Sequence, residues 1–312
     1  MPEPTLSDRL RGIFIPATTN FDAVTGEVAP VSFRDNLRKW VREPIDGILL
    51  FGSNGEGTLL DEDEKARLTA FAREVVPAGL PLLAGVGADS TRATLRQARR
   101  VAEAGADAIL VHPPPYYGAY LPPAAMVAHF REVADGSPLP TIIYHIPKYT
   151  KVTLEAGLIA ELTRHPNVVG VKDSSGDIKR FADYTDACGR SCRLFVGNGA
   201  LLYTALELGA AGAIIGLGLI APRQCAEILQ HVREGNGQRA GEVQNRIAPL
   251  HREIVARHGP VGLKAALELI GYAGGPPRPP LRPLPERERQ AVARVMHEAG
   301  LLSGSGRVVI ET

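Results

Sequence analysis

The sequence predicts a (β/α)8 barrel followed by a small C-terminal helical region. Eight short apolar runs, each bounded by Gly, Pro, Asn or Asp, recur along the 312 residues, and most are separated by a stretch with helical periodicity. Because consecutive parallel strands are joined by right-handed crossovers, eight such units close most simply into a barrel. A doubly wound open sheet is the alternative.

The predicted strands share an apolar centre between turn-forming residues. They cover residues 12–19, 47–53, 81–87, 108–113, 141–147, 168–174, 193–199 and 211–218. Several are apolar throughout their centre, as residues 48–51 are, which is typical of strands that are buried on both faces of a parallel sheet.

The segments between these strands carry recognisable helix boundaries. Residues 61–64 are all acidic and favour a helix start, and residues 89–91 offer capping side chains for the next helix. Gly105 follows that second segment and is placed to end its helix. These signals predict helices that alternate with the strands.

After the eighth strand the pattern is helical only. The predicted helices cover residues 221–234, 238–257, 260–271 and 285–299, with a linker rich in Pro and Gly at 274–283. We therefore predict a barrel domain at residues 1–235, which carries the active site, and a C-terminal helical region at residues 236–312. The last ten residues, 303–312, are expected to be loosely held.

Composition and charge exclude several kinds of partner. The 35 Lys and Arg residues balance 34 Asp and Glu residues without a block of like charge, so we expect neither a nucleic acid nor a membrane as partner. Three cysteines are too few for a disulfide framework and lack the spacing of a zinc site. No signal peptide or membrane span is indicated, so we expect a cytoplasmic protein.

Reactive groups of such a barrel collect where its strands end. The segment Gly-Ser-Asn-Gly-Glu-Gly, residues 52–57, follows the second strand, and its backbone N–H groups suit a carboxylate or a phosphate. It lacks the Gly-Lys-Ser/Thr of a P-loop, which disfavours a nucleotide. The alternative is an ordinary tight turn with Asn54 in a left-handed conformation.

Lys172 is the second candidate. The chain has seven lysines, and only Lys172 ends an apolar strand. Burial lowers the pKa of a lysine and supplies the neutral amine that Schiff-base chemistry requires. The alternative is a lysine at the rim of the strand that pairs with Asp173.

Tyr144 ends the preceding predicted strand. A phenol at that position can relay a proton to a neighbouring reacting centre. The alternative is a core aromatic residue with a satisfied hydroxyl. Its neighbour His145 points to the opposite side of a regular strand, which indicates a supporting or structural role.

The loop at residues 113–120 follows the fourth strand and combines three prolines with three tyrosines. Prolines stiffen a loop, and tyrosines present hydroxyl groups at a low cost in conformational entropy. The composition suits a lid or a contact between subunits. Simple surface packing is the alternative.

Four segments together resemble a known family. They are Gly-Ser-Asn-Gly-Glu at 52–56, Pro-Pro-Tyr-Tyr at 114–117, Tyr-His-Ile-Pro at 144–147 and Gly-Val-Lys-Asp at 170–173. In this order and spacing they are similar to the pyruvate-dependent class I aldolases, a family that includes dihydrodipicolinate synthase and N-acetylneuraminate lyase. The resemblance covers about residues 11–300.

The resemblance implies a role for each candidate. Lys172 would form a Schiff base with the C2 carbonyl of a 2-oxo acid such as pyruvate, without a cofactor or metal, and Tyr144 would shuttle the proton. The substrate carboxylate would lie on the loop that holds Gly52, Ser53 and Asn54. Tyr117 would enter the site of a neighbouring subunit, and Ile214 would place its backbone carbonyl near the imine. Family members are usually tetramers, so a dimer or tetramer is expected.

The resemblance also narrows the reaction. Dihydrodipicolinate synthases carry an arginine where this chain has Tyr149, and a Thr-Thr pair in place of Ser53 and Asn54. The Ser-Asn pair is more similar to aldolases that act on 4-hydroxy-2-oxoglutarate or on 2-keto-3-deoxy acids. We therefore expect a lyase that reversibly cleaves a 4-hydroxy-2-oxo acid to pyruvate and an aldehyde. The alternatives are a condensing synthase, a deoxy-sugar-acid dehydratase and a non-catalytic 2-oxo acid sensor.

Overall fold

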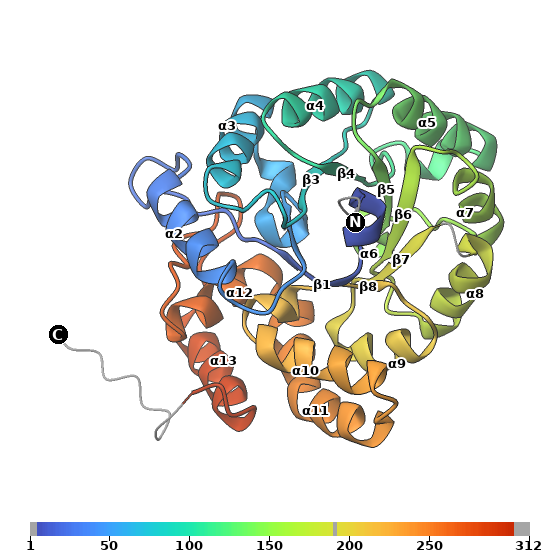
Figure 1. Ribbon diagram of the computed structural model, residues 1–312. Coiled ribbons are helices and arrows are strands. Elements are labelled where there is room, and N and C mark those ends of the chain that lie inside the picture. The colour runs from blue at the N-terminus through green and yellow to red at the C-terminus, as the bar shows by residue number, and fades with distance from the viewer. Residues whose placement is uncertain (1–4, 190–191, 303–312) are drawn as a thin grey trace.

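The computed structural model describes residues 5–189 and 192–302 and shows a closed barrel of parallel strands in chain order (Figure 1). The strands are β1 (Gly12–Pro16), β2 (Gly47–Leu50), β3 (Leu82–Val86), β4 (Ala108–Val111), β5 (Thr141–His145), β6 (Val168–Asp173), β7 (Arg193–Val196) and β8 (Gly212–Ile214). Strand β1 pairs with β2 on one side and with β8 on the other. The predicted barrel is therefore confirmed, and the open sheet is wrong.

Helices surround the strands (Figure 1). They are α2 (Pro30–Trp40), α3 (Glu62–Arg73), α4 (Thr91–Glu103), α5 (Pro123–Gly136), α6 (Pro147–Thr150), α7 (Ala156–Leu162), α8 (Ile178–Cys188), α9 (Leu202–Glu207) and α10 (Pro222–Arg233). The side chains of Asp61 and Ser90 cap the N-termini of α3 and α4, as predicted. Gly105 has a φ of 101° just after α4, a conformation that favours glycine.

The interior of the barrel is an apolar core built from alternate strand residues. It includes Phe14, Leu49, Leu83, Leu110, Ile142, Tyr144, Phe195 and Ile214. The short helix α1 (Leu6–Arg9) lies over the centre of the barrel in Figure 1, and Leu10 packs into this core. Ser7 accepts a hydrogen bond from Arg193, the first residue of β7. Helix α1 therefore covers the N-terminal ends of the strands, and the C-terminal ends are left for a site.

The C-terminal region contains α11 (Gly237–Leu250), the π-helix η6 (His251–Ala256), α12 (Arg257–Leu269) and α13 (Glu286–Glu298). Gly259 interrupts α12 with a φ of 59°, close to the predicted helix start at residue 260. The region lies beside α10 and α2 (Figure 1), where Trp40 stacks on Tyr272 at 5.2 Å. The division after residue 235 stays a prediction, and residues 303–312 lie outside the described chain.

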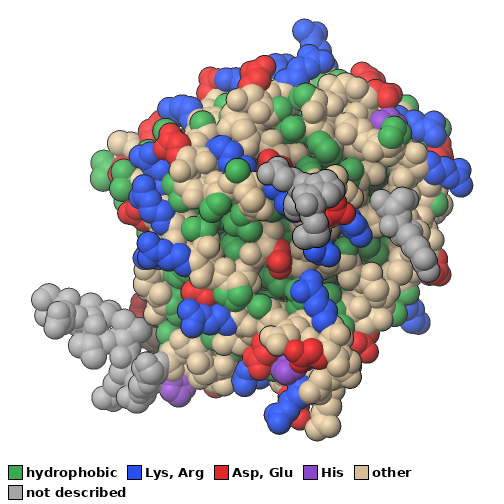
Figure 2. Space-filling model, viewed as in Figure 1, with side chains coloured by type: hydrophobic (Ala, Val, Ile, Leu, Met, Phe, Trp, Pro, Cys, Tyr) green, Lys and Arg blue, Asp and Glu red, His purple; other side chains and the backbone are tan. Residues whose placement is uncertain are grey.

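No helix within the described residues is long and apolar enough to cross a bilayer. On the face that Figure 2 shows, Lys and Arg side chains are interspersed with Asp and Glu side chains. This distribution agrees with the formal net charge of +1 of the whole sequence.

Candidate active site

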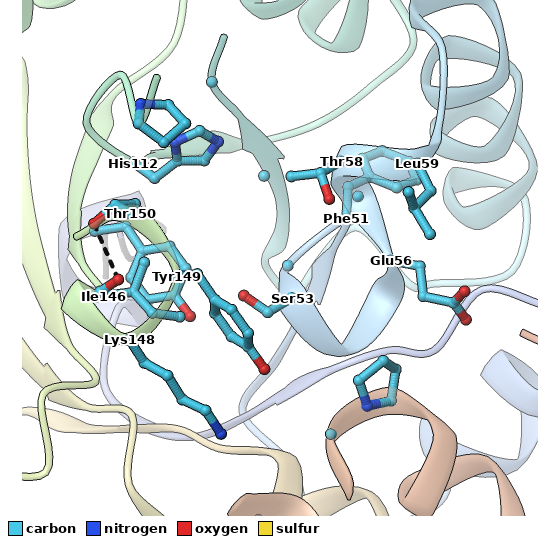
Figure 3. Close-up of a pocket in the computed structure, with 18 of the residues that line it drawn as sticks. Phe51, Ser53, Glu56, Thr58, Leu59, His112, Ile146, Lys148, Tyr149 and Thr150 are labelled. Atoms are coloured by element: carbon cyan, nitrogen blue, oxygen red, sulfur yellow. Dashed lines mark hydrogen bonds between the residues drawn. The ribbon is translucent and has the colours of Figure 1, made fainter. Parts of the chain in front are cut away.

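A cleft of about 540 Å³ opens at the C-terminal ends of the strands. Segments that follow β2 to β5 line its inner part, and the start of α12 lines its outer part. In Figure 3, Ser53 and Thr58 lie across the cleft from His112 and Tyr149. The site that the sequence predicts at the strand ends therefore coincides with a cleft that a small molecule can enter.

Lys172 and Tyr144 are brought together by the pairing of β5 with β6. The two residues are partners in this register, and the ring of Tyr144 lies in the interior core of the barrel. The Nζ atom of Lys172 lies 4.1 Å from the centroid of that ring. Tyr144 also lines the cleft, so the amine lies next to the surface that a ligand would reach.

The amine of Lys172 is buried, with 3% of the residue exposed. Burial lowers the pKa of Lys172 to about 7, and no acid among the described residues contributes to this shift. A substantial share of the amine is therefore uncharged at neutral pH, as a nucleophile for a carbonyl carbon must be.

Asp173 points away from Lys172, so the predicted alternative of a Lys172–Asp173 pair is wrong. The carboxylate of Asp173 lies 2.8 Å from Nδ1 of His145 and accepts hydrogen bonds from the amide and hydroxyl of Ser175. The ring of His145 packs against Tyr184 of α8, outside the barrel. His145 therefore supports the strand ends from the outer face, as the alternation of a strand predicts.

The phenol of Tyr144 is buried, and burial raises its pKa above the usual value. The nearby hydroxyls of Ser53 and Ser174 have the opposite effect on this pKa, but the net shift is still upward. Tyr144 is therefore protonated at neutral pH and has a proton to donate. Its contact with Ser53 connects the amine on β6 with the loop after β2.

That loop consists of two short 3-10 turns, η1 (Ser53–Gly55) and η2 (Gly57–Leu59). The left-handed residues are Phe51 and Glu56, with φ values of 57° and 54°, so the left-handed Asn54 of the alternative interpretation is wrong. A side chain at Gly57 would overlap the carbonyl of Phe51, which explains the glycine there. The amides of Ser53 and Asn54 open the first turn and have no acceptor within it.

Asn54 and Ile214 lie on the β8 side of the site. A Cβ atom added to Gly216 would lie 2.6 Å from Nδ2 of Asn54, so this amide points toward the end of β8. Ile214 pairs with Phe14 of β1, and its side chain is buried in the interior core. The structure thus brings Gly52, Ser53 and Tyr144 into the lining of the cleft, whereas Asn54, in the loop after β2, and Ile214, in β8, lie outside that lining.

Tyr117 does not reach the cleft of its own chain. It is 60% exposed and precedes the 3-10 turn η3 (Gly118–Tyr120). Its ring packs against that of Tyr116 with the centroids 4.8 Å apart, and the amide of Tyr116 donates to Asp89. The predicted role of Tyr117 in a neighbouring subunit stays a prediction.

Two titratable residues of the cleft were missed in the sequence. His112 follows β4, and burial lowers the pKa of its ring. Because it ends a predicted apolar run, the search for polar residues at strand ends could have found it. Burial also lowers the pKa of Lys65 in α3 to about 8, and its Nζ donates to Oε1 of Gln97. No signal in the sequence separates Lys65 from a solvent-exposed helical lysine.

The outer wall of the cleft comes from the C-terminal region. Arg257 and His258 line it there, next to Lys148 and Tyr149 of α6. Sequence reasoning did not place the C-terminal residues in the site, because the contact between α6 and α12 is a tertiary one. No group of three His, Cys, Asp or Glu side chains in the described ranges could hold a metal ion.

Comparison with known sequences agrees with the resemblance drawn above. The model of the dihydrodipicolinate synthetase family matches residues 9–299. A 4-hydroxy-tetrahydrodipicolinate synthase from Acidiphilium cryptum is 34% identical over 263 residues, which cover 84% of this chain and 89% of that protein. The similarity therefore extends over the barrel and most of the C-terminal region.

Solved structures give the same result. Dihydrodipicolinate synthase from Cyanidioschyzon merolae, solved with lysine bound, has a TM-score of 0.89 at 28% identity and covers 94% of this chain and 99% of its own. A prophage protein of the same family from E. coli K12, solved with pyruvate, has a TM-score of 0.88 at 25% identity, with the same coverage. The chain therefore belongs to the dihydrodipicolinate synthetase family, whose members are pyruvate-dependent lyases that use a lysine Schiff base and no external cofactor.

Proposed function

We propose that Lys172 forms a Schiff base with pyruvate and that the chain joins the resulting enamine to an aldehyde. The observation that carries this proposal is the buried amine of Lys172. Its pKa is about 7 because of burial alone, and its Nζ lies 4.1 Å from the ring centroid of Tyr144. A sensor that only binds a 2-oxo acid has no need of such an amine.

The proposed reaction follows from these groups. The neutral amine attacks C2 of pyruvate, water leaves, and the protonated imine loses a proton from C3 to a water molecule in the cleft to give an enamine; this proton later restores the phenol of Tyr144. C3 then attacks the aldehyde carbon, and the new alkoxide takes a proton from the Tyr144 phenol. Water hydrolyses the imine, which releases a 4-hydroxy-2-oxo acid and regenerates the amine.

The loop after β2 suits the carboxylate of pyruvate. The amides of Ser53 and Asn54 begin η1, where N–H groups lack an acceptor within the turn. The hydroxyl of Ser53 also lies near the phenol of Tyr144, whose ring faces Lys172, so a carboxylate held here would place its neighbouring carbonyl carbon near Lys172. The carbonyl of Ile214 would approach the same imine from β8.

The condensing direction has the better support, because the relatives named above are synthases. The cleavage expected from the sequence is the same reaction in reverse, so it concerns the same carbon–carbon bond. Cleavage stays the second candidate because Tyr149 lines the cleft at the position where synthases have an arginine. The two candidates differ in the aldehyde that the outer cleft accepts.

The outer wall supports an aldehyde with an acidic group. Lys148, Arg257 and His258 carry basic groups at this wall, and Nζ of Lys148 donates to the carbonyl of Ala256. Glu253 lies 3.2 Å from Arg257 and Glu288 lies 3.6 Å from His258, and both carboxylates are about half exposed to solvent, so they neutralise the wall only in part. An anionic aldehyde would find complementary charge there.

Reduction with borohydride tests the imine. We expect incubation with pyruvate and borohydride to leave a stable carboxyethyl group on Lys172, located by peptide mass analysis. Lys65 is a matched internal control, because it is a second buried lysine at the same cleft. An unmodified Lys172 would overturn the proposal and favour the sensor.

A substrate panel then separates the reactions. Consumption of pyruvate with anionic aldehydes in preference to neutral ones supports the condensation. Faster release of pyruvate from 4-hydroxy-2-oxo acids supports cleavage as the main activity. Loss of water from a deoxy-sugar acid without release of pyruvate would identify the dehydratase.

We also propose a homo-oligomer, a dimer or tetramer, in which Tyr117 enters the site of the neighbouring subunit. The support is the exposure of Tyr116, Tyr117 and Tyr120 on one loop at the active-site end of the barrel. Mixing Lys172→Arg subunits with Tyr117→Phe subunits tests it, because a shared site regains both side chains. Activity above the sum of the two separate variants is expected, and a simple sum would contradict the proposal.

A further inference from the structure

Glu56 is an unexpected residue in the loop after β2. Its backbone is left-handed, with φ 54° and ψ 32°. Residues other than Gly, Asn and Asp rarely adopt this conformation. It ends the turn that holds Ser53 and Asn54, and its N–H donates to the carbonyl of Ser53 at 3.3 Å. Its carboxylate is buried and, in Figure 3, points away from Ser53. Something outside the loop must therefore hold it.

The C-terminal region supplies the partners of this carboxylate. Nζ of Lys264, in α12, lies 2.6 Å from Oε1, and the backbone N–H of Arg278 donates to Oε2 at 2.8 Å. Nζ of Lys264 also donates to the carbonyl of Pro276 at 2.8 Å. Both side chains of the ion pair are almost wholly buried, so each charge depends on the other for compensation.

Arg278 anchors the same loop at a second point. Its guanidinium group donates to both carboxylate oxygens of Glu64 at 2.6 Å and to the carbonyl of Leu59 at 3.0 Å. Leu59 ends η2, and Glu64 belongs to the capping box of α3. Such a two-pronged contact fixes direction as well as distance. The loop is therefore held at Glu56 and again where it enters α3.

The cations of Lys264 and Arg278 also contact the ring of Phe21, in the segment after β1. Nζ of Lys264 and Cζ of Arg278 lie 4.6 Å and 4.4 Å from its centroid. The four charged residues Glu56, Glu64, Lys264 and Arg278, called the Glu56 cluster here, thus join three parts of the molecule. These parts are the segment after β1, the loop after β2 and the C-terminal region.

We propose that the Glu56 cluster is the means by which the C-terminal region sets the conformation of the turn that binds the substrate carboxylate. Glu56, Lys264 and Arg278 are then positioning residues that act through Ser53 and Asn54. The proposal rests on the proposed function, because the turn matters here as the carboxylate site. None of the three residues contacts Lys172 or Tyr144, so their loss is expected to weaken pyruvate binding more than the chemistry of the bound imine.

Borohydride trapping at increasing pyruvate concentration separates these effects. The variants are Lys264→Met and Arg278→Met, which remove one cation each. The matched control is Arg289→Met, which removes the exposed ion pair between α13 and Glu268 of α12 without touching the loop. We expect the pyruvate concentration for half-maximal trapping to rise about tenfold or more in the two variants, with the limiting rate changed less than about threefold. The control should match the wild type.

The outcomes distinguish the two proposals. If pyruvate and borohydride do not modify Lys172 in the wild type, the proposed function is wrong. That result would not by itself test the Glu56 cluster. If the wild type is modified and the folded variants show the same dependence of trapping on pyruvate concentration, the positioning role is wrong. Should Lys264→Met fail to fold by circular dichroism, Arg278→Met decides alone, because it keeps the backbone bond to Glu56 and the Lys264–Glu56 pair and loses the side-chain contacts of Arg278 with Glu64, Leu59, Gly26 and Phe21.

Discussion

Lys172 in the barrel and Lys264 in the C-terminal region are both buried, with 3% and 2% exposed, but they have opposite surroundings. Lys172 faces the ring of Tyr144, and burial alone brings its pKa to about 7. Burial lowers the pKa of Lys264 as well, but the carboxylate of Glu56, which lies 2.6 Å from its Nζ, opposes that lowering. The partner, and not burial itself, decides whether a buried lysine is a nucleophile or a structural cation.

The difference assigns a separate task to each region. The barrel keeps the amine of Lys172 without an acid partner at the end of β6, which costs stability but leaves a reactive group. The C-terminal region keeps a fully paired ammonium, which holds the loop after β2 in place. The following predictions test this division, beginning with the largest expected effect.

Replacing Lys172 should abolish catalysis. In Lys172→Arg the guanidinium group stays protonated at neutral pH, so no neutral amine is available to form an imine. We expect neither adduct nor turnover above background, measured by trapping and by pyruvate consumption. Lys264→Arg keeps a cation beside Glu56 and should still form the adduct at Lys172. Turnover by Lys172→Arg at the rate of the wild type would disprove the mechanism.

Removing the phenol of Tyr144 should slow the reaction without preventing the imine. Tyr144→Phe loses the proton donor but keeps the ring beside Lys172, so we expect turnover to fall by about 10²–10⁴-fold. Trapping of pyruvate at saturation should persist. Steady-state rates measure the loss of turnover, and trapping yields measure imine formation. Loss of both to the same extent would indicate a structural role for the ring.

The two lysines should affect stability in opposite directions. Lys264→Met leaves the Glu56 carboxylate buried without its partner, so we expect the free energy of unfolding to fall by about 3–5 kcal/mol. Lys172→Met removes a buried amine that has no acid partner, and we expect a rise of roughly 1–3 kcal/mol. Urea unfolding at pH 7 measures both. A similar loss in both variants would contradict the division of tasks.

The reactivity of Lys172 should depend on pH near neutrality. The neutral amine forms above the pKa of about 7, so trapping at low pyruvate concentration should fall about tenfold per pH unit below pH 7 and level off above it. Lys264 should stay unmodified throughout, because its amine is buried in the ion pair with Glu56 and does not face the cleft. Peptide mass analysis across this range follows both sites. A Lys172 profile that still rises above pH 9 would show an ordinary, solvated lysine.

The sequence was sufficient for the barrel and for the pair at its centre. Apolar runs between turn residues identify the strands, and Tyr144 and Lys172 come together because they end neighbouring parallel strands. The left-handed Phe51 and Glu56 were not foreseen, since they depend on how closely Gly57 approaches the carbonyl of Phe51. Such contacts are set by the folded loop and not by local preference.

The partners of Glu56 were also beyond the reach of sequence reasoning. Lys264 lies in a helix that reads as ordinary amphipathic sequence, and Arg278 lies in a linker without periodicity. The outer wall of the cleft has the same origin, because Arg257 and His258 reach it only after the C-terminal helices have packed on the barrel. The partners of Glu56 and the outer wall of the cleft both depend on tertiary contacts between segments that are far apart in the sequence.

Helix α1 lies across the barrel end opposite the cleft, and Leu10 packs into the interior core. A molecule that reaches Lys172 must therefore enter and leave by the same mouth. The amine lies deeper than the basic outer wall, so the proposed reaction requires the 2-oxo acid to be loaded first and the aldehyde second. In that reaction an aldehyde that arrives early would obstruct the route of its co-substrate, and we expect excess aldehyde to inhibit and added pyruvate to relieve the inhibition.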